Sequence, residues 1–435
     1  MQILSCPSGG RNRKTPFLAG NGGSRNFRIP CLWAGEDGAL YAAADVRWDS
    51  EADGGGLAVA FARSRDGGEN WEYSFPGFLG DSGGRHDRSA STLMDPMLTV
   101  SGNTVFLLCD LFPHGRAMLT GEAGAEKKLS PGNGFDGEGR LRLRARGEPE
   151  YRFRLENGAI RDETGKIRDD YEVGPWFSLR GRGEESNLFF RGAPFEVFPT
   201  SYLCLLISRD GGESWEAPVL LPGKREEEAF LGTAPGRGLV TRRGDLLFPV
   251  YNGEEASILF SKDGGGSFRR SPGVPGTESQ LVELPDGRIR AFLRNRSGYL
   301  HYVDFEAAED GYRPGKLVEA GPALCSDCMA SALSLPGKDF RIALSAPSGK
   351  GSRAGRFGGK LLVFGLDGGG GMTLLTERAL GGEEDFFAYS CLAALPDGAL
   401  GVLYEDSCLT YLGEPRGEGF SRVVFRKLSR PEDET

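Results

Sequence analysis

The sequence predicts an all-β protein, and more specifically a six-bladed β-propeller that carries a small β-rich insertion. Short apolar runs such as Leu246–Tyr251 and Leu361–Phe364 recur between Gly and Asp turns, which is the pattern of many short strands. The 67 glycines gather in turn clusters rather than at a fixed triplet spacing, so a collagen-like chain is excluded. Long stretches with a helical period are scarce, and 435 residues are enough for a large core.

A short motif of the form Ser-x-Asp-x-Gly-x-x-aromatic repeats along the chain. It occurs at Ser64–Trp71, Ser208–Trp215 and Ser261–Phe268, with a degenerate copy at Gly365–Gly369. The last three copies are spaced by one or two units of about 52 residues, as expected for propeller blades. The longer first interval indicates an insertion. The Asp accepts hydrogen bonds from its own turn and the Gly permits positive φ, so we interpret the motif as structural.

A second repeat consists of hairpins whose turns are Asp37-Gly38, Asp286-Gly287 and Asp397-Gly398. Asp-Gly between two strand-like runs is a strong hairpin signal. Residues at equal distances from a hairpin turn lie side by side at its open end. Counting outward predicts three neighbouring pairs: Arg28 with Arg47, Glu278 with Arg294, and Tyr389 with Glu405.

These open ends should converge near the axis of a propeller, on one face. A further hairpin, centred on Gly102, adds Asp95 to the same rim. The turns of the Ser-x-Asp motif should then lie elsewhere on each blade.

The predicted cluster combines arginines, carboxylates and one tyrosine. Arginine presents a planar, permanently charged fork that binds a carboxylate through two hydrogen bonds. Tyr389 beside Glu278 would form a nucleophile with its base, because a phenol of ordinary pKa near 10 needs a proton acceptor. A tyrosine nucleophile among retaining glycosidases is the exception found in sialidases. A neutral phenol avoids repulsion by the carboxylate that sialic acid carries on its anomeric carbon.

Five segments match a known family. They are Phe27-Arg28-Ile29-Pro30, the Glu278 to Arg294 segment, Ser345-Ala-Pro347 with Arg356-Phe-Gly-Gly359, Phe387-Ala388-Tyr389-Ser390, and Leu403-Tyr404-Glu405. Together with the repeated Ser-x-Asp-x-Gly-x-x-aromatic motif, which is known as the Asp box, they resemble bacterial exo-α-sialidases (neuraminidases). The resemblance implies a catalytic propeller over residues 1–435.

The resemblance also implies a role for each residue of the site. The substrate carboxylate would be held by three arginines, Arg28, Arg294 and Arg356, with Arg353 as a rival for the third. Asp53 would be the general acid/base, Tyr389 the nucleophile and Glu278 its base. Glu405 would steady Arg28, and Arg47 and Asp95 would contact the sugar's 4-hydroxyl.

Phe198–Tyr202 and Phe230–Gly238 resemble a subgroup with a small inserted β-domain, which we place at about residues 120–190. Two departures stand out. Ala58 occupies a position that is usually acidic, and Thr410-Tyr411 occupies the region where members that release 2,7-anhydro-sialic acid carry a tryptophan. The second departure favours hydrolysis, although Tyr411 offers a ring that stacks in a similar way.

Composition sets the remaining expectations. The net charge of −9 argues against nucleic acid as a partner, and no apolar run reaches membrane-spanning length. Met1–Lys14 lacks the apolar core of a signal peptide, so we expect a cytoplasmic protein, although a secreted protein that has lost its signal would look the same. We expect a monomer with sialylated glycans as partners and eight reduced, buried thiols. We expect neither cofactor nor metal, since Cys325 and Cys328 have no second pair.

Three alternatives remain. The same site could end in transfer, giving 2,7-anhydro-sialic acid or a sialylated acceptor. The protein could bind sialic acid without turnover. It could also be an Asp-box scaffold of another kind, in which case Arg28, Arg294 and Arg356 would lie far apart.

Overall fold

The computed structural model describes residues 5–48, 53–80, 91–118, 127–324, 327–335, 337, 339–349, 355–406, 410–411, 414–415 and 422–429. Strands make up its regular structure, apart from two single-turn 3₁₀ helices among these residues, η1 (Asn21–Gly23) and η2 (Pro175–Phe177). The prediction of an all-β protein is therefore confirmed. Within the described part of the chain, no helix is long and apolar enough to cross a membrane.

The long strands form antiparallel groups that follow one another along the chain. The first group contains β2 (Asn26–Ala34), β3 (Leu40–Arg47), β4 (Leu57–Ser64) and β5 (Asn70–Gly77), with β1 (Gly10–Arg13) along β5. The second contains β6 (Thr92–Ser101), β7 (Thr104–Phe112), β17 (Tyr202–Ser208) and β18 (Val219–Leu221). The third contains β22 (Leu246–Tyr251), β23 (Glu255–Ser261) and the short β19 (Gly232–Thr233), β21 (Leu239–Val240), β24 (Arg269–Arg270) and β25 (Val274–Pro275).

The second half of the chain is more regular. One group contains β26 (Ser279–Glu283), β27 (Ile289–Leu293), β28 (Tyr299–Ala308) and β29 (Gly311–Ala323). The next contains β30 (Ser331–Leu335), β31 (Arg341–Pro347), β32 (Gly359–Leu366) and β33 (Met372–Ala379). The last contains β34 (Ala388–Ala394), β35 (Leu400–Asp406) and β38 (Arg422–Leu428). Separately, the short β20 (Gly236–Arg237) pairs in parallel with β6 of the second group.

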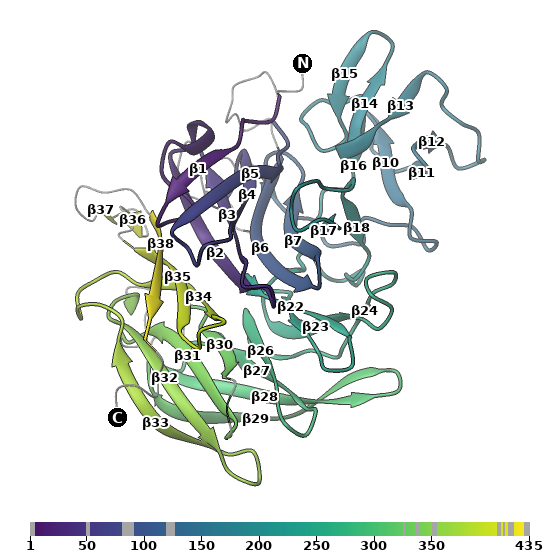
Figure 1. Cartoon of the computed structure of the whole chain (residues 1–435). Coiled ribbons are helices and arrows are strands. Elements are labelled where there is room, and N and C mark those ends of the chain that lie inside the picture. The colour runs from purple at the N-terminus through teal and green to yellow at the C-terminus, as the bar shows by residue number, and fades with distance from the viewer. Residues whose placement is uncertain are drawn as a thin grey trace.

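These groups surround a common centre (Figure 1). Consecutive inner strands contact one another: β2 with β6, β6 with β19, β22 with β26, β26 with β30, and β30 with β34. Strand β34 in turn contacts β2, so the last group meets the first. The amide of Leu32 donates a hydrogen bond to Cys391 Sγ across this junction at 3.2 Å, and Thr15 Oγ1 donates to the Val423 carbonyl at 2.8 Å.

The insertion lies between β7 and β17 of one sheet. Its strands form a sheet of β10 (Leu141–Ala145), β11 (Phe153–Glu156), β12 (Ala159–Arg161) and β16 (Phe195–Val197), and another of β13 (Tyr171–Val173), β14 (Ser178–Gly181) and β15 (Glu184–Asn187). The short β8 (Arg116–Ala117) and β9 (Lys127–Lys128) precede them. In Figure 1 these sheets project from the upper right of the ring. The inserted β-domain was predicted at about residues 120–190, and these strands span residues 116–197.

The Asp-box turns join neighbouring sheets. In the first copy, Asp66 Oδ1 accepts the amide of Asn70 at 2.9 Å and Trp71 Nε1 donates to the Gly68 carbonyl at 2.9 Å. The Trp71 ring packs edge-on against Phe425 of β38, with 5.5 Å between ring centroids. The turn lies at the Ser64 end of β4, whereas Leu57 at the other end pairs with Arg47. The box is therefore remote from the end of the sheet that carries Arg47, as predicted.

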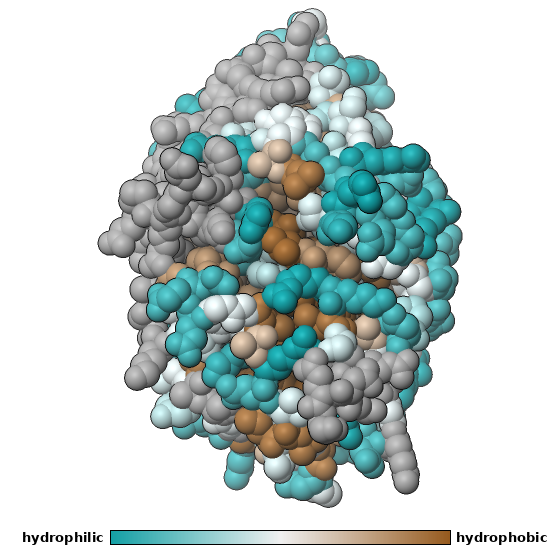
Figure 2. Space-filling model, turned by 60° about the vertical axis from the view of Figure 1, so that its left-hand side comes forward, coloured by the Kyte–Doolittle hydropathy of each residue, from teal (hydrophilic) through white to brown (hydrophobic). Residues whose placement is uncertain are grey.

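Apolar residues fill the space between sheets, and the six described cysteines are free thiols. Five of these cysteines are buried, whereas Cys6 is exposed, so the expectation of buried thiols is wrong for Cys6. Figure 2 shows a face where apolar residues lie in a furrow interrupted by hydrophilic ones. This face presents no continuous apolar surface.

Gly68→Ala should lower the free energy of unfolding by about 2–4 kcal/mol. Gly68 has φ of 94°, where a side chain is strained, and an added Cβ would overlap the Phe425 ring. Gly67→Ala is the matched control, because Gly67 also has positive φ (70°) but no atom lies within 4 Å of its added Cβ. Urea unfolding followed by tryptophan fluorescence measures both. Equal losses in the two variants would contradict the packing role of Gly68.

Candidate active site

Three inner strands bend at the same place. Ile29 in β2, Asp95 in β6 and Tyr389 in β34 have φ of 53°, 54° and 44°. Each lies at a shift in strand register, which marks a β-bulge. Positive φ is uncommon for residues other than glycine and is costly for a β-branched residue such as Ile29. Specific contacts must therefore hold these bulges in place.

A buried acidic residue lies across the sheet from each bulge. Arg28 pairs with Asp45, Met94 with Asp110, and Ala388 with Glu405. Each of these carboxylates reaches the next sheet around the ring rather than its own bulge. Glu405 accepts the amide of Ile29, Asp45 that of Asp95, and Asp110 that of Thr233, each at 2.8 Å.

The bulges explain two errors in the predicted pairing. Arg28 lies opposite Asp45 rather than Arg47, and Arg47 lies opposite Asn26. Glu405 lies opposite Ala388 rather than Tyr389. A bulge places two residues opposite one, so counting from the turn fails beyond it.

The prediction that Glu278 lies beside Arg294 is confirmed, because this hairpin has no register shift. The amide of Arg294 donates to the Glu278 carbonyl at 2.8 Å, and Arg294 Nη1 lies 2.7 Å from Glu278 Oε2. Tyr389 Oη donates to Glu278 Oε1 at 3.1 Å and accepts from Arg294 Nη1 at 3.1 Å. Tyr389, Glu278 and Arg294 thus form one hydrogen-bonded cluster.

Asp327 completes this cluster and was missed in the sequence. Its Oδ1 accepts from Arg294 Nε at 3.2 Å and from Nη2 at 3.0 Å. Its side chain is buried. Asp327 is part of the Cys325–Cys328 segment, which we had considered only as a weak metal motif. Cys325 lies outside the described residues, and Cys328 is a buried thiol in the apolar cluster that contains Tyr389.

Arg28 and Arg356 are the other two arginines predicted to hold the substrate carboxylate. Arg28 Nε lies 3.3 Å from Glu405 Oε1, and its Nη1 lies 3.9 Å from Asp53 Oδ1. The Arg356 guanidinium lies 5.0 Å from the centroid of the Tyr389 ring. Arg353, the alternative third arginine, lies outside the described residues. The structure therefore brings Arg28, Arg294 and Arg356 together, contrary to what an Asp-box scaffold of another kind would require.

Asp53 is held by Arg47, which is fully buried. Arg47 Nη1 donates to Asp53 Oδ1 at 2.7 Å, and its Nη2 donates to Asp45 Oδ2 at 2.6 Å. The Asp53 side chain is half exposed, whereas that of Asp45 is inaccessible. Asp53 thus faces the open side of the site and Asp45 lies beneath it. Asp95 is linked to this arrangement, because its amide donates a hydrogen bond to Asp45.

The electrostatics of the site act in opposite directions on its two central groups. Burial raises the pKa of the Tyr389 phenol, and Glu278 raises it further, against the opposing effects of Arg294 and Arg356. Tyr389 is therefore neutral at rest. Burial would also raise the pKa of Asp53, but Arg47, Arg28 and Arg356 outweigh it and hold that pKa below its usual value. Asp53 is therefore ionised at rest.

For Asp95 and Asp110, the interactions that would favour the ionised form are weaker than the effect of burial. Burial raises the pKa of each well above its usual range, and neighbouring carboxylates such as Asp45 add to the rise. Their neutral forms are favoured. Neutral Asp95 can donate a hydrogen bond as well as accept one, which suits contact with a hydroxyl.

The structure describes the backbone at both positions that depart from the family pattern, Ala58 and Thr410–Tyr411. Ala58 is buried in β4 opposite Val46, so it adds no charge to the site. Thr410–Tyr411 forms β36, which pairs with β37 (Glu414–Pro415). The side chain of Tyr411 lies outside what the structure describes, so its predicted stacking stays a prediction.

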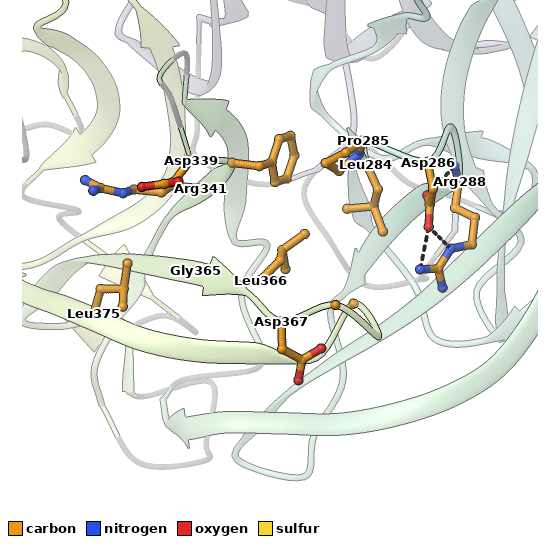
Figure 3. Close-up of a pocket in the computed structure, with 13 residues that line it drawn as sticks. Leu284, Pro285, Asp286, Arg288, Asp339, Arg341, Gly365, Leu366, Asp367 and Leu375 are labelled. Atoms are coloured by element: carbon orange, nitrogen blue, oxygen red, sulfur yellow. Dashed lines mark hydrogen bonds and ion pairs between the residues drawn. The ribbon is translucent and has the colours of Figure 1, made fainter.

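A separate cavity of about 580 Å³ lies at the opposite end of the β26–β27 hairpin (Figure 3). It is lined by turns that include Asp286, Asp339 and Asp367, and Arg288 is paired with Asp286 there. Glu278 and Arg294 lie at the other end of the same hairpin, so this cavity is distinct from the arginine cluster. Among the described residues, no group of three or more His, Cys, Asp or Glu side chains is arranged to hold a metal ion.

Comparison with known proteins agrees with this geometry, although no protein-family model matches the chain. Sialidase B of Streptococcus pneumoniae is 28% identical over 458 residues, which cover 89% of this chain and 63% of that protein. The anhydrosialidase of Macrobdella decora is 27% identical over 463 residues, covering 89% and 59%. The chain thus spans less than two thirds of the length of these relatives.

Two solved structures share the fold. The intramolecular trans-sialidase from Ruminococcus gnavus, in complex with oseltamivir carboxylate, has a TM-score of 0.80 at 26% identity, covering 95% of this chain and 96% of that one. The leech intramolecular trans-sialidase, in complex with 2,7-anhydro-Neu5Ac, has a TM-score of 0.82 at 25% identity, covering 96% and 70%. These similarities confirm the resemblance to sialidases and the β-propeller fold.

Proposed function

We propose that this sialidase-like propeller is a retaining exo-α-sialidase, a glycoside hydrolase that removes terminal sialic acid from glycans through a tyrosyl-enzyme intermediate. One observation carries the proposal. Arg294 and Arg356 lie against a buried tyrosine whose hydroxyl is hydrogen-bonded to Glu278, and Arg28 lies 3.9 Å from Asp53, whose pKa Arg356 also lowers. Cations gathered around a neutral nucleophile suit a substrate whose anomeric carbon carries a carboxylate.

Binding would use Arg28, Arg294 and Arg356 against the substrate carboxylate. Glu405 offsets the charge of Arg28, and Glu278 with Asp327 offsets that of Arg294. These carboxylates offset the repulsion among the arginines before the substrate binds. Arg47 and Asp95 would contact the sugar's 4-hydroxyl, which agrees with the neutral form of Asp95.

The reaction would proceed in two displacements. Substrate binding would first raise the pKa of Asp53, because the bound carboxylate offsets the charges of Arg28 and Arg356, and Asp53 takes up a proton. In the first displacement, Glu278 takes the proton of Tyr389, the phenol oxygen bonds to the anomeric carbon, and the glycosidic bond breaks as Asp53 gives its proton to the leaving oxygen. In the second, Asp53 takes a proton from water, the water oxygen bonds to the anomeric carbon, and Tyr389 leaves and recovers its proton from Glu278. Two inversions retain the configuration.

We also infer that the propeller has six blades. The strand groups beginning with β2, β6, β22, β26, β30 and β34 each supply inner strands, and the contact of β34 with β2 supports closure of the ring. Six blades would direct the bulges at Ile29, Asp95 and Tyr389 toward one axis.

A second candidate function is intramolecular transfer, which releases 2,7-anhydro-sialic acid. The names of the leech and Ruminococcus gnavus proteins favour it, whereas the absence of a tryptophan at Thr410–Tyr411 favours hydrolysis. NMR of the product released from a sialyllactose separates them. Free sialic acid would support hydrolysis. A 2,7-anhydro product would refute hydrolysis and support intramolecular transfer.

Tyr389→Phe should lower the release of 4-methylumbelliferone from its α-sialoside by at least about a thousandfold, because the nucleophile is lost. Tyr404→Phe is the matched control, since Tyr404 is a buried tyrosine on β35 that stacks on Phe387. It should keep most of the activity. A folded wild type without activity on any sialoside would refute the proposed function, and full activity in Tyr389→Phe would refute the nucleophile.

The alkaline limb of kcat should lie at higher pH than that of kcat/KM when a sialyllactose is the substrate. The acid must be protonated, so activity is lost as the pH rises through the pKa of Asp53. Arg28 and Arg356 lower this pKa in the free protein, and a bound carboxylate would offset both charges and raise it. Initial rates across a pH series measure both limbs. If the alkaline limbs of kcat and kcat/KM fall at the same pH, substrate binding does not raise the pKa of Asp53.

A further inference from the structure

We infer that Asp45 is a positioning residue, which orients Arg47 toward Asp53 and ties this pair to the bulge at Asp95. The inference rests on the proposed function for the role of Asp53, but not for the geometry. Asp45 uses one oxygen for the Arg47 guanidinium, at 2.6 Å, and the other for the Asp95 amide, at 2.8 Å. A single inaccessible carboxylate thus links two sheets and two candidate site residues.

Arg47 depends on this contact for its orientation. Its guanidinium is fully buried and lies between Asp45 and the half-exposed Asp53, 2.7 Å from the latter. Planar guanidinium groups bind carboxylates in fixed directions, so the Asp45 contact sets where the other edge of Arg47 points.

The arrangement also sets the charge that Asp53 experiences. Arg47, Arg28 and Arg356 lower the pKa of Asp53, whereas Asp45 and Asp95 face it with like charge when ionised. Burial raises the pKa of Asp45 to about 6, against the attraction of Arg47. The pKa of Asp53 lies below that of Asp45, so Asp45 is protonated where Asp53 titrates and acts on it through the orientation of Arg47.

Asp45→Asn should therefore move the alkaline limb of kcat/KM on a sialyllactose to higher pH by about one unit, because a misoriented Arg47 no longer holds down the pKa of Asp53. At pH values below this limb, kcat/KM should fall by about tenfold to a hundredfold, since the acid is less well placed. The aryl sialoside should be less affected, because its phenolic leaving group needs little protonation.

Asp110→Asn is the matched control. Asp110 occupies the equivalent position opposite the bulge in the next sheet and accepts the Thr233 amide. No arginine contact with Asp110 is described, and its neutral form is favoured, so Asn preserves its charge state. This variant should show a similar change in stability while leaving the alkaline limb in place.

The titration of Asp53 gives a readout that does not need activity. With ¹³C-labelled aspartate carboxyls, the Asp53 resonance is identified by its absence in Asp53→Asn. Its midpoint should rise in Asp45→Asn, because Arg47 then holds Asp53 less closely, and stay unchanged in Asp110→Asn. An unchanged midpoint and limb in Asp45→Asn would overturn the inference. A wild type inactive on all sialosides would instead overturn the proposed function, and the Asp53 titration would still decide the role of Asp45.

If Asp45→Asn does not fold, the reciprocal measurement remains. Coupling between two sites acts equally in both directions. Asp53→Asn changes a half-exposed side chain and should lower the midpoint of the Asp45 carboxyl, because the like charge of Asp53 no longer raises its pKa. An unchanged Asp45 midpoint would overturn the inference.

Discussion

Buried carboxylates that accept amide hydrogens from the neighbouring sheet hold the centre of this protein together. A buried carboxylate is costly unless it is hydrogen-bonded and paired. Glu405 meets both needs with Arg28 and the Ile29 amide, and Asp45 does so with Arg47 and the Asp95 amide. Removing one partner of such a pair typically costs about 3–5 kcal/mol. The assembly of the ring and the placement of the charged groups are therefore one problem.

Glu405 and Asp45 also hold strained backbone in place, because they accept the amides of Ile29 and Asp95 at two of the three bulges. Ile29, Asp95 and Tyr389 each have positive φ, a conformation that surrounding contacts must impose. The bulge turns each inner strand so that the side chains beside it face the common centre rather than following the regular alternation of the strand. Tyr389 thereby reaches Glu278 and Arg294, which belong to a different sheet.

Several parts of this arrangement could be predicted from the sequence. The Glu278–Arg294 pair followed from the hairpin count because that hairpin is regular. The pairing of Arg28 and of Tyr389 did not follow, because each bulge adds a residue that the count cannot see. Asp45 was within reach: it lies eight residues after Asp37, as Arg294 and Glu405 lie eight after Asp286 and Asp397. Asp327 had no such signal, since it lies outside the hairpin repeat.

The sequence by itself determined the strands, the Asp-box turns and the residue types of the site. These depend on local patterns: apolar alternation, Asp-Gly turns, and arginines near strand ends. Only the tertiary structure decided which carboxylate serves which arginine, because those partners come from sheets far apart in the chain, as with Arg28 and Glu405. It also decided the protonation of Tyr389 and Asp53, since burial and the sum of surrounding charges set a pKa, and neither exists until the ring has formed.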